Sequence, residues 1–124
     1  MNLIQLSALS GALAVAFGAF GAHALKAHLD VSQLAVYQTA FTYHMAHSLA
    51  AFTTLCFAQN RQSPKLYNAA ALFLLGVLLF SGSLYLLAIT GISWLGAITP
   101  LGGVSFIVAW IIVVLNVKGS VNGH

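Results

Sequence analysis

The segment S-P-K-L-Y-N-A-A-A-L-F-L-L-G-V-L-L-F-S-G-S-L-Y-L-L-A-I, residues 63–89, decides the fold of this chain. It carries no charge after Lys65, and it exceeds the ~20 apolar residues that a helix needs to cross a bilayer. Its first two residues are typical of a helix start, because a serine hydroxyl can accept a hydrogen bond from a first-turn amide and proline suits the first helical position. We therefore predict a transmembrane helix over 64–89.

Three more apolar runs flank this segment. They cover roughly residues 3–22, 31–58 and 100–117. Two of these runs begin with capping signals. Asp30 is followed by Gln33 at the spacing of a capping box, and Thr99 precedes Pro100. We assign the polar or glycine-broken segments between the runs to loops, at 23–30, 59–63 and 90–99.

The composition places nearly the whole chain in lipid. Of its 124 residues, 60% are hydrophobic and 4% are charged, whereas soluble domains carry roughly 25% charged residues. We predict an all-α membrane protein, a four-transmembrane-helix bundle that forms a single domain over residues 1–124. The lipid bilayer is then its main partner. No basic run is present, which argues against nucleic acid.

Residues that could carry chemistry are few. Cys56 is the only cysteine, which excludes an intrachain disulfide and a thiolate-rich metal site. Asp30, the only acid, lies outside the apolar runs, which argues against a transporter driven by an intramembrane carboxylate. No nucleophile–base set is evident, so we predict that the protein is not an enzyme and acts as an accessory or membrane-stabilising component. A conduit for an ion or an uncharged solute is a weaker alternative, because about four thin helices enclose little lumen.

Charged residues indicate the orientation of the bundle. Arg61, Lys65 and Lys118 fall on one side of a four-helix protein, whereas Lys26 on the other side is offset by Asp30. Because positive charge concentrates in cytoplasmic loops, we predict that both termini and the second loop are cytoplasmic. The first and third loops then lie outside, in a multi-pass protein of the bacterial inner (plasma) membrane.

Small residues recur along the first run at helical spacing. One narrow arc contains Ser7, Gly11, Ala14, Gly18 and Ala22. Faces of this kind let helix backbones approach closely in lipid. We expect this face to pack within the molecule, against the second or third helix. Self-association, or contact with another membrane protein, is the alternative.

The second run is the least lipid-like, and its polar residues form one stripe. By angular count the stripe contains Gln33, Tyr37, Ala40, Phe41, His44, His47, Ser48 and Ala51. His44 lies about 20 Å along the helix, near the middle of a hydrocarbon core about 30 Å thick. Ionisable groups at that depth are costly, so we expect His44 and His47 to face the bundle interior toward the first and third helices. Ser81 and Gly18 should lie at the same depth, so that Ser81 offers His44 a hydroxyl partner.

Three interpretations of the histidine pair remain open. In the first, neutral imidazoles bond between helices and set their register. In the second, the pair binds a metal or haem, although residues three apart on one helix cannot take both axial positions of one haem. In the third, His44, His47 and Tyr37 form a site for a quinone, a lipid headgroup or a proton relay. We favour the first and predict no cofactor, with a site for a redox cofactor, quinone or metal at these residues as the alternative.

Five strings, in order along nearly the whole chain, resemble one family. They are G-A-F-G-A-H (18–23), Q-T-A (38–40), Y-H-M-A-H-S-L-A (43–50), L-L-F-S-G-S-L-Y-L-L (78–87) and G-A-I-T-P-L-G-G (96–103). The chain is similar to the small membrane family catalogued as domain of unknown function 423. The resemblance implies a four-helix protein of bacterial inner membranes, with mitochondrial relatives and an unassigned biochemical role. The positions that it marks are Gly18, Gly21, His23, Tyr43, His44, His47, Ser81, Gly82, Ser83, Thr99 and Pro100.

Overall fold

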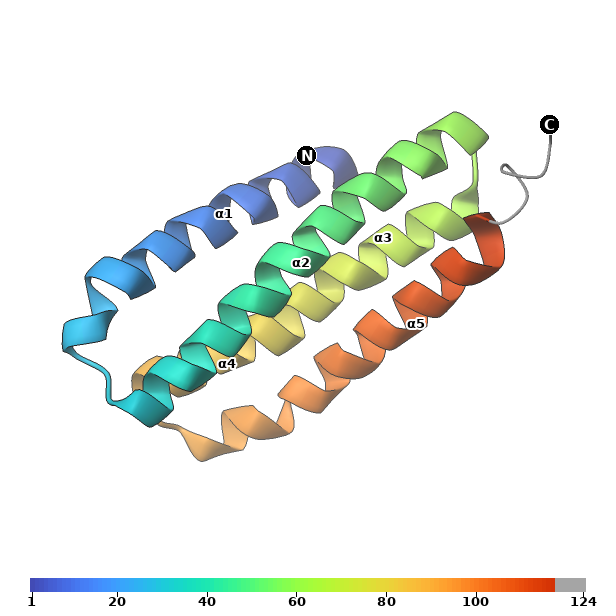
Figure 1. The fold of residues 1–124 in the computed structure, drawn as a ribbon. Helices are drawn as coiled ribbons and strands as arrows, with labels where there is room; N and C mark the ends of the chain where they lie inside the picture. The colour runs from blue at the N-terminus through green and yellow to red at the C-terminus, as the bar shows by residue number, and fades with distance from the viewer. Residues whose placement is uncertain (118–124) are drawn as a thin grey trace.

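The structure, a computed structural model, describes residues 1–117, which contain helices and no β-strand. The α-helices are α1 (Leu3–His23), α2 (Val31–Arg61), α3 (Pro64–Gly76), α4 (Gly82–Thr90) and α5 (Thr99–Val117). The π-helical turn η2 (Val77–Ser81) joins α3 and α4 into one rod, and two 3₁₀ helices, η1 (Leu25–Ala27) and η3 (Ser93–Ala97), lie in the connections. Figure 1 shows the rods side by side as an antiparallel bundle. Lys118, on which the orientation partly depends, lies outside the described residues.

Three rods are long and apolar enough to cross a membrane, by length and composition. They are Leu3–Ala27, Pro64–Thr90 and Ser93–Val117. The fourth helix, α2, has 31 residues, about 46 Å at 1.5 Å per residue, so its length suffices, but its polar stripe makes it less apolar. The all-α prediction is therefore confirmed for the described residues, with three apolar rods of spanning length and a fourth helix beside them.

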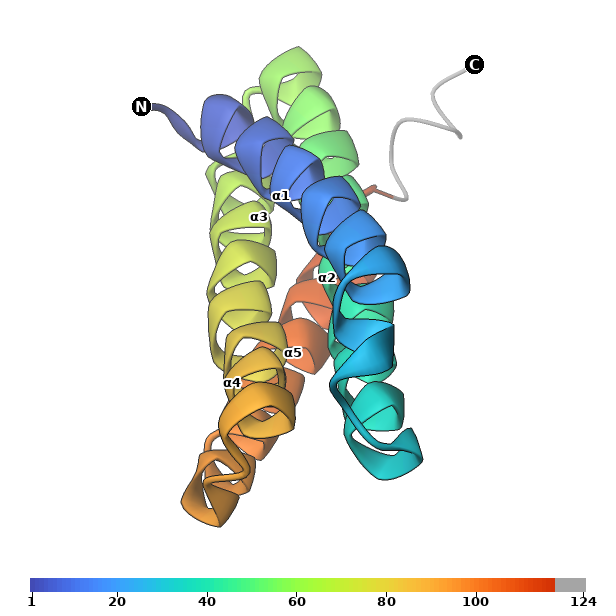
Figure 2. The same ribbon diagram turned by 90° about the vertical axis from the view of Figure 1, so that its left-hand side faces the viewer.

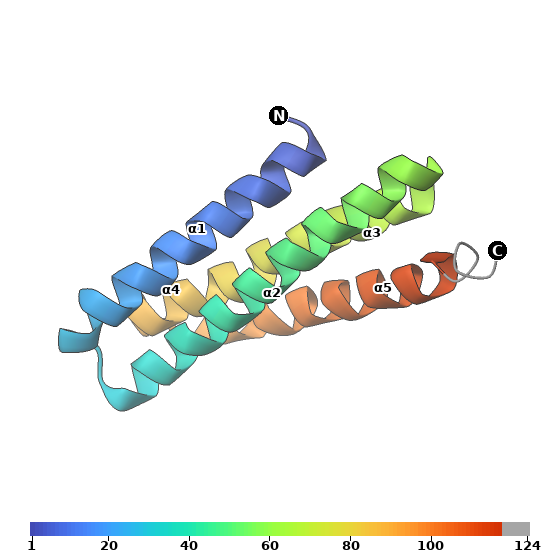
Figure 3. The ribbon, with the colours of Figure 1, turned by 45° about the horizontal axis from the view of Figure 1, so that its top comes forward.

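The central position of α2 explains its polar residues. Figures 1 and 3 show α2 between α1 and α5, and it also packs along α3 and α4. In Figure 2 the rod α3–α4 and α2 stand next to each other, with α1 crossing them. The polar residues that α2 buries are His44, His47, Ser48 and Thr54. A central helix tolerates such groups because neighbouring helices, rather than lipid, surround them.

Two of the predicted helix starts are confirmed. Asp30 accepts the Gln33 amide at 2.7 Å, while the Gln33 side chain accepts the Asp30 amide at 2.9 Å, which completes a capping box. Ser63 accepts the Leu66 amide at 3.3 Å, directly ahead of Pro64. These bonds satisfy amides that a helix start otherwise leaves without a partner.

The predicted capping role of Thr99 is wrong. The segment 90–99, expected to be a loop, contains η3, which continues almost directly into α5, and the Leu101 amide donates to the Ile98 carbonyl at 3.0 Å. Thr99 is thus already the first residue of α5, and its hydroxyl bonds to that of Ser83 in α4 at 2.7 Å. Its side chain joins two rods instead of capping one.

The helix predicted over 64–89 is interrupted by the π-turn η2. The Gly82 amide donates to the carbonyl of Val77, five residues earlier. A β-carbon on Gly102 of α5 would lie 2.4 Å from the backbone nitrogen of Phe80, and one on Gly76 would lie 2.4 Å from the ring of Phe106. Glycine therefore lets α5 pack directly against the widened turn.

Most of the small residues on this face of α1 pack within the molecule, whereas a β-carbon on Gly11 would meet nothing within 4 Å. A β-carbon on Gly18 would lie 2.5 Å from the ring of Phe41, and one on Gly21 would lie 2.3 Å from the ring of Tyr37. Ser7 and Ala14 on the same face are buried. Ala22, which the angular count included, is exposed, and Gly21 takes its place against α2. This face thus supports the expected contact between the first and second helices.

Candidate functional site

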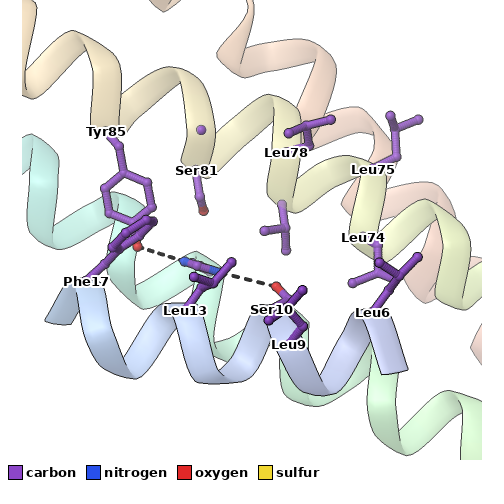
Figure 4. Close-up of a pocket in the computed structure, with 13 residues that line it drawn as sticks. Leu6, Leu9, Ser10, Leu13, Phe17, Leu74, Leu75, Leu78, Ser81 and Tyr85 are labelled. Atoms are coloured by element: carbon purple, nitrogen blue, oxygen red, sulfur yellow. Dashed lines mark hydrogen bonds between the residues drawn. The ribbon is translucent and has the colours of Figure 1, made fainter. Parts of the chain in front are cut away.

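His44 lies at the centre of a chain of hydrogen bonds that joins three rods. Its side chain is 4% exposed. Its Nδ1 lies 2.9 Å from Oη of Tyr85 in α4, and its Nε2 lies 3.2 Å from Oγ of Ser10 in α1. Ser10 in turn bonds to the hydroxyl of Ser48, back on α2. Figure 4 shows the two bonds of the imidazole between Tyr85 and Ser10.

The chain through His44 is compatible with two arrangements of its protons. In one, Tyr85 donates to Nδ1, Nε2–H donates to Ser10, and Ser10 donates to Ser48. In the other, every bond reverses, so that Nδ1–H donates to Tyr85 and the Tyr85 O–H is released for another acceptor. Both arrangements follow from the fact that a neutral imidazole has one donor and one acceptor, while hydroxyls serve as either.

His47 has partners that allow only one tautomer of a neutral ring. Its Nδ1 lies 2.9 Å from the Tyr43 carbonyl, which can only accept, so Nδ1 carries the proton. Its Nε2 then accepts a hydrogen bond from the Trp110 indole of α5 at 3.1 Å. The ring also stacks on Phe106 with centroids 3.7 Å apart and planes 11° apart. His47 is therefore held by α5 on one side and by its own helix on the other.

The histidine pair faces inward, as expected, but its partners differ from the prediction. His44 contacts α1 and the rod that contains α4, whereas His47 contacts α5. Ser81 is not a partner of His44: its hydroxyl is buried and has no hydrogen-bond partner among the described residues. Gly18 packs against the ring of Phe41, one helical turn before His44 on α2. Tyr85 and Ser10 take the role that Ser81 was expected to fill.

The hydrogen bonds of the two histidine rings bear on whether the pair could bind a metal. Both ring nitrogens of His47 already have partners, and so do those of His44, so a metal would have to displace a hydrogen bond to reach either ring. In the described part of the chain, no group of three or more His, Cys, Asp or Glu side chains converges. The two histidines are therefore placed to join helices.

Tyr37 and Tyr43 border the polar layer, which consists of the hydrogen-bonded side chains of Ser10, His44, His47, Ser48, Tyr85 and Trp110. Tyr37, 4% exposed, donates from Oη to the Phe17 carbonyl of α1 at 2.6 Å, and its ring centroid lies 5.0 Å from that of Tyr85. Tyr43 is 41% exposed and stacks parallel to His47, with centroids 5.7 Å apart. Tyr37 thus belongs to the contact between α1 and α2, and Tyr43 covers His47 from the outside.

The other positions that the family resemblance marked do not form one cluster. Ser83 donates to the Phe80 carbonyl at 3.0 Å and pairs with Thr99. Gly82 has open space where a β-carbon would lie. Pro100 follows Thr99 in the first turn of α5, and His23 is exposed at the end of α1. Of the marked positions, His44, Ser81 and Gly82 line the same pocket.

Sequence reasoning missed three residues of the layer, Ser10, Tyr85 and Trp110. Each left a signal. Tyr85 lies one helical turn after Ser81, and Ser10 is a hydroxyl within the first apolar run. Trp110 lies well inside the last run, whereas indoles of membrane proteins gather at the interface, so an interior partner could have been expected.

Apolar rods of spanning length around an inward-facing polar layer are typical of helical membrane proteins. A family model described as a protein of unknown function (DUF423) matches residues 17–103. The chain belongs to this family.

The sequence of this chain is similar to those of named relatives over nearly their whole lengths. The chain is 46% identical over 113 residues to the UPF0382 membrane protein YwdK of Bacillus subtilis, covering 90% of this chain and 92% of that protein. It is 43% identical to the UPF0382 membrane protein SSP2132 of Staphylococcus saprophyticus, covering 91% and 93%. It is 36% identical to the UPF0382 inner membrane protein YgdD of Escherichia coli, covering 92% and 87%. No solved structure matches the chain.

Proposed function

We propose that this protein is a four-span component of the bacterial inner membrane that acts without catalysis, as an accessory or membrane-stabilising protein. One observation carries the proposal: all four ring nitrogens of His44 and His47 are used in hydrogen bonds, three of them to other helices. Polar groups that bond to neighbouring helices set the register of helices in lipid, where no hydrophobic force drives helices together.

The arrangement of charges supports four spans with both termini in the cytoplasm. Arg61 lies at the end of α2 and Lys65 at the start of α3, at one end of the bundle. Lys26 and Asp30 lie in the connection between α1 and α2, at the opposite end. With α2 counted as a span, the excess of basic residues falls on a single side, which is the cytoplasmic one by the positive-inside rule.

The role of His44 can be tested by two replacements. In His44→Gln, an amide still offers a donor and an acceptor to Tyr85 and Ser10, so we expect stability in detergent within about 1 kcal/mol of the wild type. In His44→Leu, both bonds are lost and the Tyr85 hydroxyl stays buried, so we expect a loss of about 2–3 kcal/mol. Reversible unfolding of the purified protein measures both values.

A ligand role for the imidazole makes the opposite prediction. If His44 binds a metal or haem, Gln and Leu should be equally damaging to ligand content, because an amide replaces imidazole poorly as a ligand. Absorption spectra and metal analysis of protein purified in a mild detergent give this readout. A stoichiometric metal or a haem band that both variants lose would overturn the structural role.

A further inference from the structure

A pocket opens between α1 and the rod α3–α4, with the polar layer at one end. Its volume is about 480 Å³. Its walls are leucines of α1 and of α3–η2, shown in Figure 4: Leu6, Leu9, Leu13, Leu74, Leu75 and Leu78. Leu78 is 69% exposed and Leu13 is 43% exposed, so the pocket opens sideways, toward the surface that lipid surrounds. A molecule dissolved in the bilayer could enter it without crossing water.

The polar end of this pocket contains a hydroxyl that the protein leaves unused. Ser81 is 1% exposed, and its Oγ has no hydrogen-bond partner among the described residues. In Figure 4 the Ser81 side chain points from its rod toward α1, into the pocket. A buried donor without an acceptor is costly, and a ligand that supplies an acceptor would remove that cost. Tyr85 offers a second donor when Nδ1–H of His44 donates to it.

The lining also defines the charge and shape of the occupant. Lys, Arg, Asp and Glu are all missing from the pocket lining, so an ionised head would have no counter-charge there. The rings of Phe17 and Tyr85 line the same end, with centroids 5.0 Å apart and planes at 76°. Aromatic faces and edges of this kind suit a flat ring. The walls suit a hydrocarbon chain.

We propose that this pocket binds a prenylated quinone, a neutral ring whose carbonyl oxygen accepts a hydrogen bond from Ser81 and whose chain lies along the leucines. This binding goes beyond the accessory role and does not depend on it. A lipid acyl chain would also fit the walls, but it would leave the Ser81 hydroxyl without an acceptor. The two occupants therefore differ in whether Ser81 matters.

The test uses the full chain in a mild detergent with decylubiquinone as the probe and decylbenzene, which has no oxygen, as the control compound. Binding is measured from the rise in unfolding temperature with probe concentration at constant detergent, and by native mass spectrometry. We expect decylubiquinone to bind and decylbenzene to bind at least fivefold more weakly. We expect Ser81→Ala to weaken decylubiquinone binding about fivefold, the value of one neutral hydrogen bond.

Two tryptophan variants locate the site. Leu13→Trp fills the pocket and should abolish binding. Leu49→Trp makes the same change in a separate groove, beside Trp110, and should leave binding unchanged. If Leu13→Trp does not fold, Ser81→Ala decides alone, because that change breaks no hydrogen bond within the described chain.

The proposal is overturned by any of three results. The wild type binds no decylubiquinone, Ser81→Ala binds it as tightly as the wild type, or decylbenzene binds equally well. The last two results would identify a groove for lipid chains.

Discussion

Ser81 and Ser83 lie two residues apart on one rod, and both are buried, yet they differ in their bonds. Ser83 bonds to the Phe80 carbonyl and to the Thr99 hydroxyl, whereas Ser81 bonds to nothing among the described residues. A net contribution of about 1 kcal/mol is typical of a satisfied hydrogen bond, while an unsatisfied buried hydroxyl is unfavourable. Comparing the two serines therefore separates the free-energy cost of burying a hydroxyl from the free energy gained through its hydrogen bonds.

We predict different effects of alanine at the two serines on the stability of the ligand-free protein. Ser83→Ala should lower the free energy of unfolding in detergent by about 1 kcal/mol, because it removes a link between α4 and α5. Ser81→Ala should leave that free energy unchanged or raise it. Equilibrium unfolding of both variants in the same detergent provides the comparison. A loss at Ser81 as large as at Ser83 would mean that Ser81 has a bonding partner in solution.

At the scale of the elements, the backbone of α5 comes close to the π-turn η2 at Gly102. A β-carbon on Gly102 would lie 2.4 Å from the Phe80 backbone nitrogen and 2.8 Å from its Cα. Backbone atoms within a rod cannot move away as a flexible side chain can. The adjacent Gly103 is different, since a β-carbon there would meet only the Phe80 ring, at 3.9 Å.

Alanine at these neighbouring glycines should therefore change stability with opposite signs. Gly102→Ala should destabilise the protein by about 1–3 kcal/mol, because α5 must separate from η2. Gly103→Ala should stabilise it by up to about 1 kcal/mol, because alanine favours the helix and meets no obstacle. Thermal or denaturant unfolding of both variants in detergent measures the difference. Equal effects would show that α5 does not rest on η2 in the membrane protein.

At the scale of the whole molecule, the membrane topology depends on whether α2 spans the membrane. Its two ends lie at opposite ends of the bundle, in the α1–α2 connection and in the tight turn before Pro64. If α2 spans the membrane, these two connections face different compartments.

Reporter insertions test this arrangement. We expect an insertion within 24–30 to report the outer side, and an insertion at Gln62 and a fusion after residue 117 to report the cytoplasm, following Arg61 and Lys65. A periplasmic phosphatase and a cytoplasmic fluorescent reporter at each position give complementary signals. The four-span arrangement fails if the sites in the two connections of α2 report the same compartment.

Several features of this protein could be predicted from residues close together in the sequence. The apolar runs, the capping box at Asp30 and the Ser63-Pro64 start depend on composition and on contacts three residues apart, and the structure contains all of them. The inward stripe of α2 was also predictable, because helical periodicity places His44 and His47 on one face and lipid excludes them from the other.

Only the tertiary structure decided which residues of the other helices contact that stripe. The partners of His44 and His47 on other helices lie 34 to 63 residues away in the sequence, at Ser10, Tyr85 and Trp110. Their identity depends on how far each rod is shifted and rotated against α2, and the π-turn changes that rotation within the rod α3–α4 by adding a residue to one turn. Periodicity measured along each helix separately contains no information on this relative placement. For this reason Ser81 was expected to bond to His44, whereas the fold brings Tyr85 to the imidazole and leaves the Ser81 hydroxyl facing the pocket.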